Sequence, residues 1–371
     1  MGKMEGLGII LGAVFIAVLI LTPIVKKIAL IVGAVDRPDA RKVHNKVMPR
    51  LGGVAIYLGF IGALLVFQPL GNFEKGLLVG STIIVAAGIL DDIWGLPPKL
   101  KLTAQIAAAA VLVSFGIKVE FVTYPFGGII PLGIFAVPIT ILWIIGVTNA
   151  LNLIDGLDGL AAGTSFIAAV TMAVVAWIEG QYAVAGLALI LGAAVLGFLP
   201  YNFYPAKIFM GDSGSMFLGF TLGSLAVQGL TKGAAFISVF IPIIILGIPI
   251  FDTLFAVIRR YRNHRPIFEA DREHFHHILL DKGFSHRQAV LLIYGVNVFL
   301  GISVILLNVL STEQSIVALI VLITAISLGA GKLGFFSRIN KKQELPSCEA
   351  AGLNNSHGQR ITAADKNGGR C

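Results

Sequence analysis

The stretch WIIGVTNALNLIDGLDGLAAGTSFIAAV (143–170) decides the fold class, because it runs from an apolar segment through a short polar one into a second apolar segment. Each apolar flank extends far enough to cross about 30 Å of hydrocarbon. Two asparagines, two aspartates and two glycines stand between them. The pattern predicts two membrane helices joined by a polar turn.

The composition supports a membrane protein throughout. The chain has 371 residues, of which 56% are hydrophobic and only 13% charged, and its mean hydropathy is +0.88. A soluble domain carries about a quarter charged residues. The net charge of +8 therefore indicates loop charge that sets orientation rather than a nucleic-acid surface. The two cysteines lie in a polar C-terminal stretch, so no disulfide framework is expected.

Apolar runs recur along the chain and predict an all-α polytopic membrane protein of about eleven transmembrane helices. They lie near 7–31, 51–69, 76–92, 102–117, 134–151, 159–178, 182–200, 214–230, 234–258, 289–309 and 314–331. Pro242, Gly247 and Pro249 predict a kink in the ninth run. Residues 1–335 are expected to form one transmembrane catalytic domain, and the polar residues 336–371 a disordered cytoplasmic tail.

Charge in the loops predicts the orientation. If successive loops alternate between the two sides, one side holds 24 of the 28 lysines and arginines. The rich side is expected to face the cytoplasm, which places the N-terminus outside and the C-terminus inside. All eleven aspartates fall on the cytoplasmic side. Residues 118–133, which alternate and then break at a glycine pair, predict a small outer β-hairpin.

Asp91-Asp92 closes the third apolar run and is the first candidate catalytic pair. Negative charge at the C-terminal end of a helix opposes the helix dipole. A compensating positive charge is therefore expected, either from a metal ion or from Lys99 and Lys101. Solvated caps of a helix end are the structural alternative for this pair.

Asn149, Asn152, Asp155 and Asp158 recur at every third residue, which predicts one polar stripe at a helix end. Amides and carboxylates on one stripe suit a polar ligand and a cation that prefers oxygen. A plain polar turn is the alternative, but a turn needs neither this period nor both asparagines.

MGDSGS (210–215) is expected to open the eighth helix. Its backbone N–H groups predict a cradle able to hold phosphate, with Lys207 as a further phosphate contact. Asp212 fits equally well as a simple N-cap.

The loop 259–288 is rich in arginine and histidine. Orientation by positive charge explains most of its arginines but not the density of imidazoles. The candidates for phosphate contact are Arg260, Arg272, His274, His276 and His277. A zinc site is an alternative, although no thiolate supports it and the neighbouring aspartates favour hard cations.

Taken together, these motifs resemble the polyprenyl-phosphate N-acetylhexosamine-1-phosphate transferases (glycosyltransferase family 4). The resemblance covers roughly residues 30–330. It is carried by PRLGGVAIYLGF (49–60), GILDD (88–92), NALNLIDGLDGLAAG (149–163), FMGDSGS (209–215) and HFHHILLDKGFSHRQAV (274–290). It implies transfer of a sugar 1-phosphate from a UDP-N-acetylhexosamine to undecaprenyl phosphate, with Mg²⁺ (or Mn²⁺), at the cytoplasmic face of a bacterial plasma membrane.

Two features favour the WecA/TagO-like branch, which uses UDP-GlcNAc, over the MraY-like branch, which uses UDP-MurNAc-pentapeptide. The MraY-like branch usually shows a His-His-His-Phe-Glu run and a lysine soon after the aspartate pair. Here the histidine run reads HFHH, and the first lysine after the pair is Lys99. The expected product is undecaprenyl-diphosphate-GlcNAc, which starts teichoic acid, O-antigen or a similar envelope glycan. A MraY-like enzyme, a membrane diphosphatase and a transporter or flippase remain alternatives. A homodimer is compatible with the sequence.

Roles follow for the candidate residues. Asp212 is expected to be the main Mg²⁺ ligand, with Asp92 or Asp155 close by, and Asp91 to orient or deprotonate the lipid phosphate. The resemblance places Asn149, Asn152, Asp155 and Asp158 beside the nucleotide-sugar and metal. It places His276, His277 and the nearby arginines on the diphosphate.

Overall fold

The computed structural model describes residues 2–37, 47–67, 69–124, 128–230, 240–262 and 274–332. The long helices are α1 (Gly2–Val32), α2 (Gly52–Phe67), α3 (Asn72–Trp94), α4 (Pro98–Ser114), α5 (Ala136–Ile154), α6 (Leu160–Ile178), α7 (Tyr182–Asn202), α8 (Gly211–Leu225), α10 (Gly247–Arg262), α12 (His286–Val309) and α13 (Thr312–Lys332). Shorter helices are α9 (Phe240–Ile245) and α11 (Phe275–Asp281), and a π-helical turn (Ala226–Leu230) follows α8.

The predicted all-α membrane fold is confirmed in its main terms. Six helices, α1, α3, α5, α6, α7 and α12, are long and apolar enough to cross a membrane, and α5 reaches that length with the 3₁₀ turn before it. Every apolar run predicted as a span coincides with helix in the described residues. The ninth run divides at Leu246 into α9 and α10, as its prolines and glycine predicted. The structure therefore supports at least six spans, while the count of eleven stays a prediction.

Helix α8 is surrounded by other helices. It packs against α2, α3 and α5, and all of its residues except Asp212 are buried. A helix that is apolar or small on every side can be enclosed in this way. Its glycines permit the close contacts: a Cβ on Gly219 would lie 2.5 Å from the Cα of Thr148 on α5.

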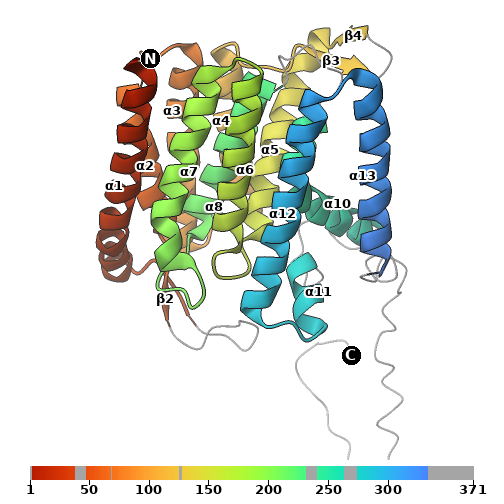
Figure 1. The fold of residues 1–371 in the computed structure, drawn as a ribbon. Coiled ribbons are helices and arrows are strands. Elements are labelled where there is room, and N and C mark those ends of the chain that lie inside the picture. The colour runs from red at the N-terminus through yellow and green to blue at the C-terminus, as the bar shows by residue number, and fades with distance from the viewer. Residues whose placement is uncertain are drawn as a thin grey trace, which may run out of the picture. The chain divides into compact units, whose positions relative to one another are not determined.

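The helix reversals bring several motifs to one end of the bundle. The end of α3 meets the start of α4, the end of α5 meets the start of α6, and the end of α7 leads into α8. The opposite end carries the antiparallel hairpin of β3 (Phe121–Tyr124) and β4 (Gly128–Pro131), which confirms the predicted hairpin (Figure 1).

A second two-stranded sheet was not predicted. β1 (Val35–Asp36) pairs antiparallel with β2 (Met48–Pro49). These strands lie with α11 at the end of the bundle away from the hairpin (Figure 1). They fix the chain just before α2, where Arg50 stands.

The chain divides into two units between Ala325 and Ile326, so the division falls inside α13. The predicted boundary at residue 335 and the predicted disordered tail lie outside the described residues.

Candidate active site

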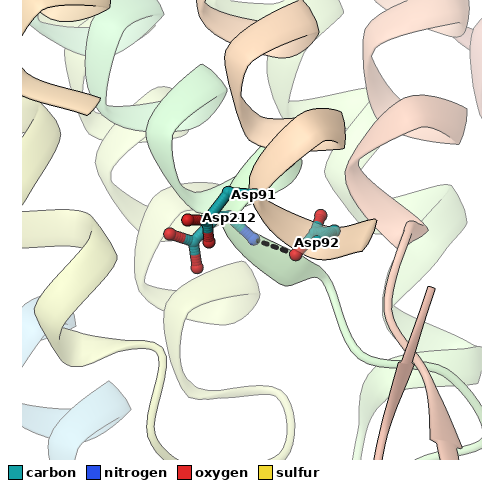
Figure 2. Close-up of side chains that lie close together, drawn as sticks. All are labelled: Asp91, Asp92 and Asp212. Carbon is teal, nitrogen blue, oxygen red and sulfur yellow. Dashed lines mark hydrogen bonds between the residues drawn. The ribbon is translucent and has the colours of Figure 1, made fainter. Parts of the chain in front are cut away.

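Three carboxylates from two helices meet at the end of the bundle that carries the aspartate motifs. Asp91 and Asp92 belong to the last turn of α3, and Asp212 to the first turn of α8 (Figure 2). An oxygen atom from each lies within 4.8 Å of the others. We call these three residues the acid cluster. Residues about 120 positions apart in sequence thus come close enough to share one cation.

Asp92 is the most fully bonded member of the cluster. Its Oδ1 accepts from the backbone N–H of Asp212 at 2.9 Å, and its Oδ2 accepts from the N–H and the hydroxyl of Ser213 at 3.1 and 2.7 Å. Gly211 makes this approach feasible: it has a φ of +74°, and a Cβ there would lie 2.4 Å from Asp92 Oδ2.

This arrangement corrects the prediction of a phosphate cradle at MGDSGS. The first N–H groups of α8 do attract an anion, as a helix N-terminus should. That anion is the protein's own Asp92 carboxylate. Asp212 does not act as the N-cap either, because the cap position is Met210.

Two cations form ion pairs with the acid cluster. Lys101 Nζ lies 2.8 Å from Asp212 Oδ2 and 3.4 Å from Asp91 Oδ1. Arg50 Nη2 lies 3.3 Å from Asp92 Oδ1 and 3.5 Å from Asp212 Oδ1. Lys101 is therefore confirmed as a compensating charge, whereas the side chain of Lys99 is exposed on the first turn of α4. Arg50 was not among the predicted site residues.

The cations shape the ionisation of the site. Burial would raise the pKa of Asp212, but the charge and hydrogen bond of Lys101, together with Arg50, outweigh it and hold that pKa below its usual value. Burial works against the charged form of Lys101, yet Asp212 and Asp91 raise its pKa. Two cations leave three carboxylates incompletely neutralised. The donors are all oxygen, which suits a hard divalent cation.

The α5–α6 turn differs from the predicted polar stripe. Helix α5 ends at Ile154, so only Asn149 and Asn152 lie on it, while Asp155 and Asp158 follow in the turn. The reason is local: the chain must reverse before α6, and it does so through Gly159, whose φ is +78°.

The two asparagines contact neighbouring helices. Asn149 exchanges amide hydrogen bonds with Gln105 of α4, at 2.7 and 3.2 Å. Asn152 donates to the hydroxyl of Ser215 on α8 at 2.9 Å. Asn149 therefore ties α5 to α4, which carries Lys101, and Asn152 ties α5 to α8, which carries Asp212.

The two turn aspartates occupy different settings. Removal from solvent, with added repulsion from Asp212, raises the pKa of Asp155 to about 7, which places this carboxyl in the field of the acid cluster. Asp158 Oδ2 accepts from the backbone N–H of Ala206 at 2.9 Å. Asp158 therefore ties the turn to the loop before α8.

The predicted histidines sit on and beside α11. His274 caps this helix, and its Nδ1 lies 2.9 Å from Asp252 Oδ2, while Asp252 Oδ1 accepts from the N–H of Phe275 at 2.8 Å. We call His274–Asp281 the histidine segment. Asp252, on α10, was left without a role by the sequence analysis, because 22 residues separate it from its partner.

His276 is buried beside the α5–α6 turn. A Cβ on Gly156 would lie 2.6 Å from His276 Nε2, so the ring faces the backbone of that turn. Burial, with repulsion from His277 and His274, lowers the pKa of His276 well below its ordinary value. The rings of His276 and His277 are 4.2 Å apart. Over the described part of the chain, the only candidate metal group is the acid cluster, so a zinc site among these histidines gains no support.

Two other predicted residues stand on segments that carry no member of the acid cluster. Lys207 is exposed, and its Nζ lies 6.0 Å from the ring centre of Tyr201. Arg260 is buried in the last turn of α10. Arg272 lies outside the described residues.

The helical bundle and its acid cluster define a polytopic membrane protein with a carboxylate cluster that is consistent with metal binding. Residues 75–230 match the sequence family described as "Glycosyl transferase family 4". The chain belongs to this family, because it shares extended identity with several of its members.

Three relatives give the extent of that identity. A Bacillus subtilis (strain 168) protein described as "Probable undecaprenyl-phosphate N-acetylglucosaminyl 1-phosphate transferase" is 46% identical over 88% of this chain and 91% of its own. A "Decaprenyl-phosphate N-acetylglucosaminephosphotransferase" of Mycolicibacterium smegmatis is 37% identical over 73% and 74%. An "Undecaprenyl-phosphate alpha-N-acetylglucosaminyl 1-phosphate transferase" of Escherichia coli (strain K12) is 31% identical over 72% and 75%.

Proposed function

We propose that this chain is an undecaprenyl-phosphate N-acetylglucosamine-1-phosphate transferase. It transfers GlcNAc-1-phosphate from UDP-GlcNAc to undecaprenyl phosphate and releases UMP. The observation that carries this assignment is 46% identity over 88% of the chain to the Bacillus subtilis protein of that description. The convergence of Asp91, Asp92 and Asp212 offers carboxylate ligands for the divalent cation that such a reaction uses.

The acid cluster is the site at which we place Mg²⁺. Its donors are carboxylate oxygens, and Mg²⁺ binds through one or two protein carboxylates while it keeps several waters. Asp212 and Asp91 are the best-placed ligands, because both oxygens of Asp92 already accept backbone or side-chain hydrogens of α8. A divalent cation held by these carboxylates would supply positive charge that neutralises the phosphates.

The protein's own residues position the two phosphates. Asp91, at the end of α3, orients the acceptor phosphate or takes its proton. One oxygen of that phosphate attacks the sugar-bearing phosphorus, the bond to the bridging oxygen breaks, and the electron pair leaves with UMP. His276 and Lys101 supply hydrogen-bond donors and positive charge to the diphosphate. Holding both reactants in one geometry provides much of the acceleration.

We place the site at the cytoplasmic face, with eleven spans and the N-terminus outside. The distribution of 24 of 28 basic residues on one side supports this orientation. Cysteine labelling tests it. After Cys348 and Cys371 are replaced by serine, a cysteine at Lys99 should react with a membrane-impermeant maleimide only in inverted vesicles, and one at Lys118 only in intact cells.

The activity is tested with purified protein, undecaprenyl phosphate and Mg²⁺, offered UDP-GlcNAc, UDP-GalNAc or UDP-MurNAc-pentapeptide in parallel. We expect UMP release that requires the lipid and is fastest with UDP-GlcNAc. Release without lipid would indicate a diphosphatase, and no turnover would favour a transporter. A trapped phospho-aspartate or ping-pong kinetics would contradict the direct displacement.

A further inference from the structure

The two cations of the acid cluster are attached to the protein in different ways. The backbone around Arg50 is bonded to the chain that leads into Asp212. Phe209 N–H donates to Pro49 O, Gly52 N–H to Phe209 O and Gly53 N–H to Met210 O, at 2.8–3.0 Å. Arg50 N–H also donates to Ala34 O at 2.9 Å.

Packing reinforces this attachment. A Cβ on Gly53 would lie 2.0 Å from the Cα of Gly214, so α2 and α8 touch through their backbones. From this anchored position Arg50 bridges Asp92 and Asp212, the two carboxylates associated with the start of α8. Arg50 is thus fixed in place relative to α8.

In the described part of the chain, the backbone of Lys101 is bonded within α4, where its N–H donates to Pro97 O at 3.3 Å, and not to the chain that leads into Asp212. Lys101 stands in the first turns of α4, next to the exposed Lys99 and Leu100, and reaches the cluster only through its long side chain. Its Nζ lies 3.4 Å from Asp91 Oδ1, which also accepts from the N–H of Leu96, and 2.8 Å from Asp212 Oδ2. A divalent cation shared by Asp91 and Asp212 would occupy the same space.

We propose that the two cations have opposite roles: Arg50 is a positioning residue that holds Asp92 and Asp212 in place, whereas Lys101 is an exchangeable counter-ion that a divalent cation displaces. Once displaced, the Lys101 ammonium is free to contact the diphosphate of the donor. This inference rests on the metal site of the proposed function, but it is independent of the donor sugar and the lipid acceptor.

The test measures Mn²⁺ binding by electron paramagnetic resonance, with the protein in nanodiscs and no substrates present. We expect K101M to bind Mn²⁺ at least about threefold more tightly than wild type, because its competitor is gone. R50M should bind about tenfold more weakly, because Asp212 loses its support. K99M, which removes an exposed lysine of the same turn, should match wild type.

A purely electrostatic effect predicts a different pattern. Removing either positive charge would then tighten Mn²⁺ binding, so tighter binding by both R50M and K101M overturns the inference. Equal Mn²⁺ affinity of wild type, R50M and K101M overturns it as well. If a thermal unfolding measurement shows that R50M is not folded, R50K takes its place in the test. R50K keeps the charge, and we expect it to bind no more tightly than wild type; tighter binding counts against the proposal. If wild type itself binds no Mn²⁺, the proposed metal site fails as well.

Discussion

The acid cluster and the histidine segment both lie near the α5–α6 turn, yet they are held in place in different ways. The acid cluster is held by hydrogen bonds to the backbone. Asp92 accepts from the first N–H groups of α8, and the backbone around Arg50 is hydrogen-bonded to the residues that precede α8. The histidine segment is bonded at its N-terminal cap to a side chain, the carboxylate of Asp252 on α10. The comparison sets a carboxylate cluster held by backbone hydrogen bonds against a group of imidazoles whose cap is held by a side chain.

The largest effect is expected at the acid cluster. In D212N the side chain keeps its shape but loses the charge that faces Lys101 and the proposed metal. Loss of a Lewis-acid contact is worth several kcal/mol, so lipid-dependent UMP release should fall on the order of 10³-fold. E179Q, at the far end of α6, should retain wild-type activity. An active D212N would remove Asp212 from the metal site.

The adjacent aspartates should separate stability from activity. D92N replaces an oxygen that accepts from the amides of α8 with an NH₂ group, so the protein should lose about 1.5–3 kcal/mol of stability. D91N should reduce activity strongly while the unfolding temperature stays close to wild type. The measurement is thermal unfolding alongside UMP release. Equal destabilisation by both would show that Asp92 has no special role in anchoring α8.

The attachment of the histidine segment is tested by D252N. The variant loses the charged acceptor of His274 Nδ1 and of the Phe275 N–H. The loss of 1.5–3 kcal/mol from one charged interaction corresponds to about a 10- to 150-fold fall in kcat/KM if His276 positioning depends on it. A double-mutant cycle with H274N provides the control, because the effects of D252N and H274N on kcat/KM should be non-additive. Full additivity would mean that Asp252 and His274 act separately.

The smallest effect concerns pH. The pKa of His276 is lowered by burial and by the neighbouring histidines, so the folded protein keeps this ring neutral. Protonation then favours the unfolded chain, and stability should decrease as the pH falls below about 6.5. The unfolding temperature should drop less between pH 7.5 and 5.5 in H276Q than in wild type. Asp155, with its pKa raised to about 7, acts in the opposite direction but is present in both proteins. Identical pH profiles would show that His276 is not held neutral.

The sequence was sufficient for the main helices and for all three members of the acid cluster. Apolar length identifies spans, and Asp91, Asp92 and Asp212 stand where apolar runs begin or end. The end of α5 was harder to predict, because a three-residue period continues past Ile154 although Gly159 turns the chain there. Arg50 was missed because its position depends on backbone hydrogen bonds to Phe209 and Met210, which no local pattern encodes.

The occupation of the α8 N-terminus by Asp92 has a consequence for inhibitor design. Anionic compounds that mimic a diphosphate commonly gain affinity from free amide groups at a helix start. Here those amides of Asp212 and Ser213 are already satisfied. Such a compound would have to evict a buried carboxylate to reach them, so chemistry directed at the Lys101 side of the site is the more productive route.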